Sequence, residues 1–160
     1  MLEIEKDRKT KTAVICPVIK TAAGMMTAEE EAARENEAAG LVLAMGQEVV
    51  FCETVRMSAI VPKSFFGKGT LERLKTACEE KGAELLVVDM PVSAVQQRNL
   101  EKMLNMKVID RTAVILEIFG QRAQTREGKL QVELAHLTYQ RGRLVRSWTH
   151  LERQRGGGGF

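Results

Sequence analysis

The chain has 160 residues, with 24 Lys and Arg against 21 Asp and Glu, and 44% of its residues are hydrophobic. This length accommodates one domain with an appendage and excludes a large two-domain enzyme, while the hydrophobic content excludes wholesale disorder. No apolar run approaches the roughly 18 residues that a membrane-spanning helix needs. The charged first residues are unlike a secretory signal, and three cysteines without CxxC spacing are typical of reduced thiols. We therefore expect a cytoplasmic protein.

The charge is uneven along the chain. Residues 1–110 hold 15 basic and 17 acidic residues, whereas residues 111–155 hold 9 basic and 4 acidic ones. Eight of these nine basic residues are Arg, whose planar fork suits phosphate groups. An Arg-rich segment on a near-neutral body favours an anionic partner such as nucleic acid, although an ordinary exposed helix surface can have the same composition.

The first part of the chain predicts alternating strands and helices. Residues 12–19 are a short apolar, β-branched run typical of a buried parallel strand, and Pro17 suggests that this strand ends or bends there. Thr27 and Glu30 form a capping box, which predicts a helix from residue 28 to 45 with Gly46 as its stop. Residues 48–55 are predicted to form a second strand.

A loop rich in Pro, Phe and Gly follows over residues 56–69. Thr70 is predicted to cap a helix that ends near Lys81, and residues 84–89 are predicted to form a third strand. Ser93 is predicted to cap a helix through residue 104, before a fourth strand at 107–110. The order β-α-β-α-β-α-β, with room for crossover helices, predicts an α/β fold with a small parallel sheet of about four strands flanked by helices.

After residue 111 the pattern becomes helical. Val114, Ile115, Ile118 and Phe119 mark one face of a short helix that packs back onto the sheet. From about Thr125, apolar residues recur at steps of four and three, which is typical of a coiled-coil seam on a helix about 40 Å long. The seam residues are Leu130, Leu134, Leu137, Leu144, Trp148 and Leu151, with Arg141 in one slot. Their partner is another chain, the α/β domain or sequence beyond residue 160, because a single helix cannot bury such a stripe.

Four segments carry a resemblance to a known family. They are Gln96–Glu101, Val108–Thr112, Gln121–Ala135 and the Gly-rich tail Thr149–Phe160. The chain resembles the N-terminal region of HflX-type GTPases from about residue 65 to the end, and before Val61 only the order of elements agrees. Thr70 departs from the family pattern, because Lys usually follows the second glycine of that turn.

The resemblance implies a ribosome-associated GTPase that binds the large ribosomal subunit and splits ribosomes, notably under stress. It implies an α/β subdomain over residues 11–123, the first helix of a two-helix arm over 124–154 and the start of a Gly-rich loop at 155–160. Residues 1–10, with their alternating charges, are expected to be disordered. The returning helix and a Ras-like domain holding GTP and Mg²⁺ are expected to lie outside this chain, which needs no cofactor of its own.

On this mapping, the basic helix and the Gly run contact ribosomal RNA near the peptidyl-transferase centre. Arg side chains neutralise phosphates, and glycine lets the backbone approach closely. The expected RNA-contacting residues are Arg122, Arg126, Lys129, Arg141, Arg143, Arg146, Arg153, Arg155, Gly156, Gly157, Gly158 and Gly159. Trp148 is expected to fill the seam rather than to stack on a base.

No catalytic constellation is expected. A P-loop needs GxxxxGK[ST], but Lys68 is followed by Gly69 and no Gly stands five residues before the Gly-Lys pair, so GTP hydrolysis by this chain is not expected. His136 and His150 have no metal-ligand partner at suitable spacing. The turn of Gly67, Lys68, Gly69 and Thr70 can bind an anion or a nucleotide at a helix N-terminus, or is simply a turn that needs glycine dihedral angles.

Three functions stay open on the sequence. The chain is a ribosome-binding module, a nucleotide-binding α/β domain that uses the turn at residues 67–70, or a module that associates with itself through the apolar seam.

Overall fold

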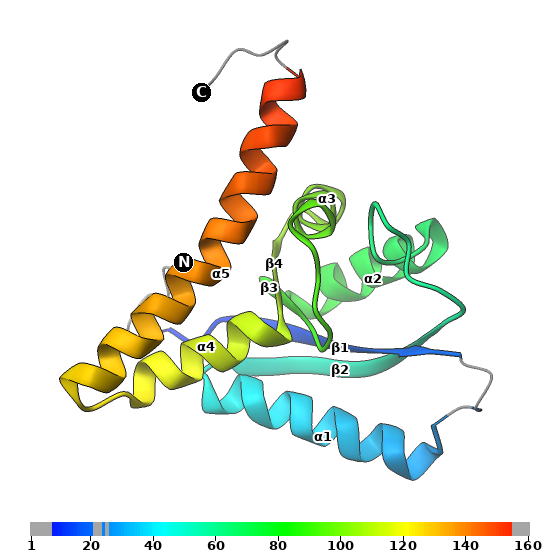
Figure 1. The fold of residues 1–160 in the computed structure, drawn as a ribbon. Coiled ribbons are helices and arrows are strands. Elements are labelled where there is room, and N and C mark those ends of the chain that lie inside the picture. The colour runs from blue at the N-terminus through cyan, green and yellow to red at the C-terminus, as the bar shows by residue number, and fades with distance from the viewer. Residues whose placement is uncertain (1–7, 21–23, 25, 155–160) are drawn as a thin grey trace.

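The expected alternation of strands and helices is present in the computed structural model, which describes residues 8–20, 24 and 26–154 (Figure 1). For residue 142 and residues 144–154 it describes the helical backbone and not the side chains. The elements are β1 (Lys11–Ile19), α1 (Ala28–Ala44), β2 (Glu48–Met57), α2 (Lys68–Lys81), β3 (Leu85–Val88), α3 (Ala94–Leu104), β4 (Lys107–Asp110), α4 (Arg111–Arg122) and α5 (Arg126–Gln154).

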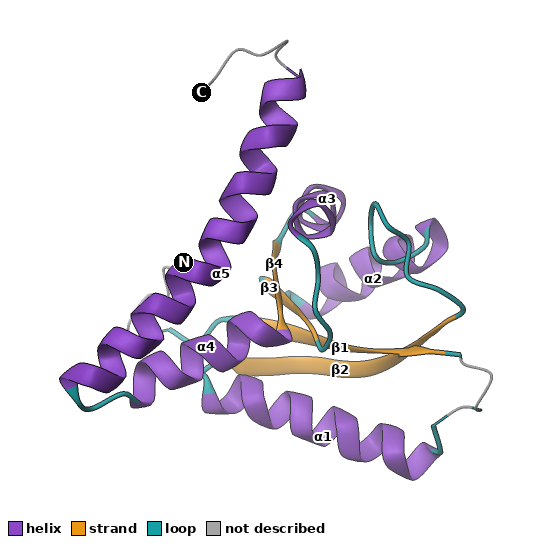
Figure 2. Cartoon of the chain, in the orientation of Figure 1, coloured by secondary structure: helices purple, strands orange, loops and turns teal. Residues whose placement is uncertain are grey.

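The four strands form one parallel sheet in the order β2-β1-β3-β4. The chain moves from β1 to β2 in one direction and then returns across β1 to reach β3. Because both crossovers are right-handed, this reversal places α1 on one face of the sheet and α2 on the other. With α4 beside α1 and α3 beside α2, the result is a three-layer arrangement (Figure 2). The predicted α/β fold is confirmed.

Successive side chains of a strand point to opposite faces of the sheet, so each strand contributes to both layers of the core. Ala13 and Ile15 of β1 face α2 and α3, together with Leu74 and Leu100 of those helices. Val14 and Cys16 of the same strand face α1 and α4, together with Val42, Val114 and Ile118. A strand that is apolar on both sides is what a parallel sheet between two helical layers requires, because each face must leave water.

Polar side chains fix where the helices begin. Thr27 caps α1 and Ser93 caps α3, each through a complete capping box with the residue three positions on. Asp110 ends β4 and also caps α4, since its carboxylate accepts the backbone N–H of Ala113 at 3.1 Å. The predicted caps at Thr27 and Ser93 are confirmed, and the cap at Asp110 is an additional one.

The start of α2 differs from the prediction. Gly67, not Thr70, is the N-cap, and Thr70 lies inside the first turn. The preceding turn takes its shape from Phe65, which is buried and has a left-handed φ of 67°. Phe65 also exchanges two backbone hydrogen bonds with Val61. This small closed loop ends earlier than a cap based on Thr70 would allow, so the helix starts three residues sooner.

One smaller expectation is also corrected, and a second falls largely outside the described residues. Strand β1 continues through Pro17 to Ile19, because β1 pairs with β3 only over Thr12–Ile15 and has an open side beyond it, where a residue without N–H is tolerated. Of the tail expected to be disordered, residues 1–7 lie outside the described part. Arg8 and Thr10 are held, Arg8 by an ion pair of 2.5 Å with Glu84 and Thr10 by a bond to the Gln47 side chain.

Candidate nucleic-acid interface

Helix α5 packs against α4 and α3 along one face and extends beyond them (Figure 1). Its half-buried side chains Val132, His136, Tyr139 and Arg143 follow helical spacing and face the α/β unit. Gly120 of α4 lies close to α5, because an added Cβ there would meet Val132 at 3.6 Å and His136 at 3.7 Å. The first half of α5 is therefore docked on the α/β unit.

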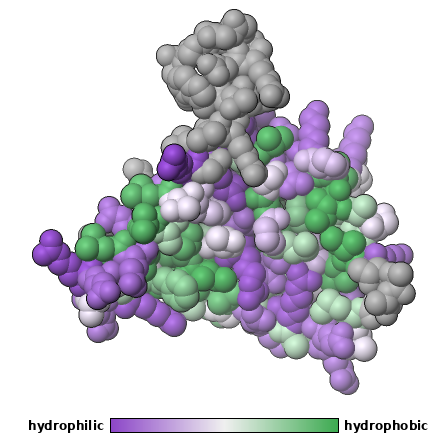
Figure 3. Space-filling model, viewed as in Figure 1, coloured by the Kyte–Doolittle hydropathy of each residue, from purple (hydrophilic) through white to green (hydrophobic). Residues whose placement is uncertain are grey.

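The leucine seam lies on the other side of this helix. Two residues of offset on an α-helix correspond to a rotation of about 200°, so the seam is opposite the docked face. Leu130, Leu134 and Leu137 are 56%, 65% and 55% exposed, and hydrophobic side chains gather over this half of α5 in the space-filling view (Figure 3). The α/β unit is therefore not the partner of these three leucines. The side chains of Leu144, Trp148 and Leu151 lie outside the described ones.

The basic residues expected to meet RNA fall into three groups. Arg122, Arg126, Lys129 and Arg141 are exposed, the first three around the joint between α4 and α5. Arg146 and Arg153 lie on the described backbone of α5, but their side chains are outside the described ones. Arg155 and Gly156 to Gly159 lie outside the described residues altogether.

Arg143 differs from this set, because its guanidinium bonds within the fold. Nη1 donates to Gln97 Oε1 at 2.5 Å, and Nη2 donates to the Val92 carbonyl at 2.7 Å and to Asp110 Oδ2 at 3.0 Å. The same group lies over the Tyr139 ring, 4.3 Å from its centroid. Its charge is already paired, so we leave Arg143 out of the residues available to a phosphate.

Asp110 is the centre of this cluster. Its side chain is 3% exposed and accepts from Arg143, from the Tyr139 hydroxyl at 2.8 Å and from the backbone N–H groups of Val92 and Ala113, both at 3.1 Å. Burial, together with the neighbouring Asp110 carboxylate, raises the pKa of Tyr139, so the phenol stays protonated and donates. One carboxylate thus joins β4, α3's entry loop, α4 and α5.

A second buried carboxylate lies one strand away. Asp89 follows β3 and pairs with Arg34 of α1 at 3.2 Å and with Arg111 of α4 at 2.8 Å. Arg111 also binds Glu37 at 2.5 Å, which lowers the pKa of that carboxyl. The carboxyl end of a strand next to the point where strand order reverses is where ligands often bind in such sheets. Here this ion network occupies the carboxyl end of β3.

The glycine turn at the start of α2 has two interpretations from the sequence, an anion or nucleotide site and a turn that needs glycine dihedral angles. Gly67 and Gly69 have ordinary φ values and nothing within 4 Å of an added Cβ, so neither the backbone conformation nor crowding requires glycine. The explanation by glycine dihedral angles is therefore wrong. A hollow beside Gly69 is lined by Glu72 and Glu80 as well as Arg73, and two carboxylates disfavour an anion there. Binding of a nucleotide at residues 67–70 stays a prediction.

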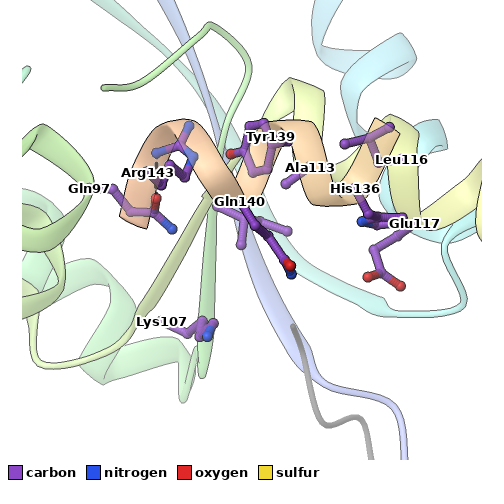
Figure 4. Close-up of a pocket in the computed structure, with 10 residues that line it drawn as sticks. Gln97, Lys107, Ala113, Leu116, Glu117, His136, Tyr139, Gln140 and Arg143 are labelled. Carbon is purple, nitrogen blue, oxygen red and sulfur yellow. Dashed lines mark hydrogen bonds between the residues drawn. The ribbon is translucent and has the colours of Figure 1, made fainter. Parts of the chain in front are cut away.

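Two hollows that share the lining residues Glu117, His136 and Gln140 lie along α4 and α5. The smaller, about 140 Å³, is lined by Tyr139 and Arg143 toward one end and by His136 and Glu117 toward the other (Figure 4). The larger, about 460 Å³, continues along the two helices past Gly120. Within the described part of the chain, Arg143 Nε is a buried nitrogen without a partner, and no group of His, Cys, Asp or Glu could hold a metal ion.

The three thiols lie in or beside the core. Cys16 and Cys78 are buried and Cys52 is half-buried, and all three are free. Burial raises the pKa of Cys78 to about 11. Over the residues that the structure describes, no helix has the length and apolarity needed to cross a bilayer.

Comparison with known families agrees with the division seen in the fold. A model of the GTP-binding GTPase N-terminal region matches residues 32–120, more than half of the chain. A model of the GTP-binding GTPase middle region matches residues 122–160, so the boundary between the two falls at the end of α4. The fold and these matches define the class: the N-terminal part of a GTP-binding GTPase.

Individual relatives name the family more closely. The GTPase HflX of Magnetococcus marinus is 52% identical over 125 residues, or 78% of this chain, and that of Escherichia coli is 47% identical over the same share. The GTPase HflX of Flavobacterium psychrophilum is 38% identical over the whole chain. The chain belongs to the HflX family. The aligned part spans 29%, 29% and 38% of these three relatives.

The family match also extends further than the sequence resemblance suggested. Because the N-terminal model begins at residue 32, the likeness includes α1 and β2 and does not start near residue 65. A solved GTP-binding protein from Sulfolobus solfataricus in complex with GDP shares the fold, with a TM-score of 0.62 and 23% identity. The superposition covers 92% of this chain and 42% of that one.

Proposed function

We propose that this chain is the N-terminal ribosome-binding module of an HflX-type GTP-binding protein, and that it docks on ribosomal RNA of the large subunit. The observation that carries the proposal is the exposure of Arg122, Arg126, Lys129 and Arg141 along α4 and α5, in a member of this family. Ribosome splitting and rescue, in translation control under stress in the cytoplasm, is the role we assign to the whole protein.

In this proposal the chemistry and the docking belong to different parts of the protein. GTP and Mg²⁺ are assigned to the part of the relatives that this chain does not span, and GTP hydrolysis is assigned to the whole protein. The chain's own contribution is electrostatic. Each phosphate neutralised by Arg or Lys releases bound counterions, which makes such an association strongly salt-dependent. RNA recognition by shape and phosphate needs few aromatic side chains, in keeping with an aromatic content of 4%.

The test is co-sedimentation with purified small and large ribosomal subunits at low and moderate salt. We expect selective, salt-sensitive pelleting with the large subunit and a loss of roughly tenfold or more in affinity for the double variant Arg126→Glu and Lys129→Glu. The matched control is Lys75→Glu with Lys81→Glu, which makes the same change in net charge on the exposed surface of α2. Equal losses for both pairs would reduce the proposal to non-specific attraction, and unchanged pelleting of the first pair would contradict it.

A second candidate function is favoured by the exposed leucines. We propose that the isolated chain associates with itself through Leu130, Leu134 and Leu137, because an apolar row of this length is rarely left in water. Analytical ultracentrifugation across a wide concentration range tests this directly. A monomeric mass at high concentration would exclude it, and replacement of Leu134 by Glu should shift any dimer to monomer.

A further inference from the structure

The docking of α5 on the α/β unit rests on little apolar burial. Among the described side chains of this helix, none belongs to the buried core, and Val132 is the one branched aliphatic residue on the docked face that is half-buried. Apolar contact is non-directional, so a contact of this size leaves a long helix free to pivot or slide. Something else must set its direction.

Directional bonds are concentrated at the far end of the docked face. Tyr139 and Arg143 bring four hydrogen bonds to three partners, Asp110, Gln97 and Val92, that come from β4, α3 and the loop between β3 and α3. These partners are themselves fixed: Val92 N–H donates to Asp110, and Gln97 Nε2 donates to the Val108 carbonyl at 2.8 Å. A buried polar cluster of this kind contributes little net stability and instead specifies one geometry.

We propose that Arg143, with Tyr139, is a positioning residue that sets the direction of α5 beyond the docked half. The segment that continues from it, residues 144–154, carries Arg146 and Arg153. The proposal rests on the RNA-docking function, because a fixed direction matters when those residues must reach a fixed surface. Arg143 acts through the position of the helix and makes no contact with the RNA itself.

The shape of the Arg143 side chain makes this testable. Its planar fork reaches three acceptors from two nitrogens, and a lysine ammonium of equal charge on a flexible stem cannot reproduce that arrangement. A residue that contacts phosphate as a positive charge tolerates Arg→Lys. A residue that fixes an angle does not. Arg141, exposed and two positions earlier on the same helix, is the matched control.

The first readout is the motion of α5 beyond Arg143. Trp148 is the chain's single tryptophan and lies on α5 beyond Arg143, so time-resolved fluorescence anisotropy reports how that part of the helix moves without added labels. We expect Arg143→Lys to enlarge the nanosecond component of the decay by roughly twofold or more, while Arg141→Lys leaves it unchanged. Tyr139→Phe, which removes one bond to Asp110, should give a smaller change in the same direction.

The second readout is co-sedimentation with large ribosomal subunits. We expect roughly tenfold weaker binding for Arg143→Lys and little change for Arg73→Lys, which alters an exposed arginine of α2 outside the proposed interface, although both variants keep the charge. If the anisotropy of Arg143→Lys and Tyr139→Phe matches the unsubstituted chain, the positioning role is overturned whatever the binding shows. If the anisotropy changes but the unsubstituted chain fails to bind large subunits, the docking function fails and the positioning role stands. Circular dichroism identifies a variant that has lost the α/β fold, in which case Tyr139→Phe alone decides.

Discussion

The α/β unit and helix α5 are held by different forces. In the unit, apolar side chains such as Ile15, Leu74 and Leu100 are completely buried on both faces of the sheet. On α5 the described leucines face water, and the contact with the unit ends in bonds among Tyr139, Arg143 and Asp110. Burial makes a fold stable but is indifferent to small rotations, whereas hydrogen bonds add less stability and define an angle. The unit therefore supplies stability and the polar cluster supplies orientation.

The largest difference in unfolding free energy should separate a leucine in the core of the α/β unit from a leucine on the exposed face of α5. Leu74→Ala removes a side chain with no exposed area and should lower the free energy of unfolding by about 2–5 kcal/mol. Leu134→Ala removes the same atoms from a side chain that is 65% exposed in the single chain, and at concentrations where the chain is monomeric its effect should stay within about 0.5 kcal/mol. Urea unfolding followed by circular dichroism measures both. Similar losses for the two variants would mean that the seam of α5 is buried in solution, for instance in a dimer.

The next largest effect should come from Asp110. Asp110→Ala leaves the half-buried Arg143 guanidinium without its counter-charge and also removes the cap of α4, so we expect a loss of about 3–5 kcal/mol. Thermal unfolding of this variant and of Arg143→Met separates the two contributions, since Arg143→Met leaves the cap in place. The double variant Asp110→Asn with Arg143→Met leaves neither charge unpaired, and a loss as large as that of Leu74→Ala in this variant would make the cluster a main source of stability, contrary to the division of roles between the two regions.

Ser93 tests the contribution of a single cap. Its side chain accepts from the Gln96 backbone N–H at 3.1 Å while the Gln96 side chain bonds back to Ser93 N–H, so Ser93→Ala should cost about 1 kcal/mol. Ser58 is exposed and lies outside the helices and strands, and Ser58→Ala is therefore the control. Chemical denaturation resolves a difference of this size. Equal midpoints for both variants would show that the loop from β3 sets the start of α3 without its cap.

Most of the fold could be predicted because its signals are local. Capping residues at Thr27 and Ser93 marked two helix starts, and apolar runs marked four strands whose order left a parallel sheet as the natural solution. The start of α2 could not be predicted in the same way, because it depends on a left-handed Phe65 held by Val61. Propensity alone does not anticipate a bulky residue in that conformation.

Two overlapping periodicities explain why the docked face of α5 could not be predicted from the sequence. The leucine repeat from Leu130 to Leu151 dominates the pattern of α5, and Val132, His136, Tyr139 and Arg143 repeat at similar spacing two positions later. A mixed set of polar and apolar residues gives a weak signal, so the sequence alone groups Arg143 with its charged neighbours and not with the docked face. Asp110 was similarly assigned to a strand end alone, since its four bonds come from three parts of the chain that only the fold brings together.

The smallest effect should be a pH dependence at the ion network around Arg111. The Arg111 guanidinium lowers the pKa of Glu37 below its ordinary value of 4.5, so this carboxylate stabilises the fold above that pH and the contribution is lost as the pH falls through the lowered pKa. Glu37 is 58% exposed on its side chain, so water and salt screen most of the attraction. Glu37→Gln should therefore show a small deficit in unfolding free energy at pH 7 that disappears in the most acidic buffers. Arg111 keeps its bond to the buried Asp89 throughout. A deficit that persists unchanged at low pH would assign the effect to packing instead of charge.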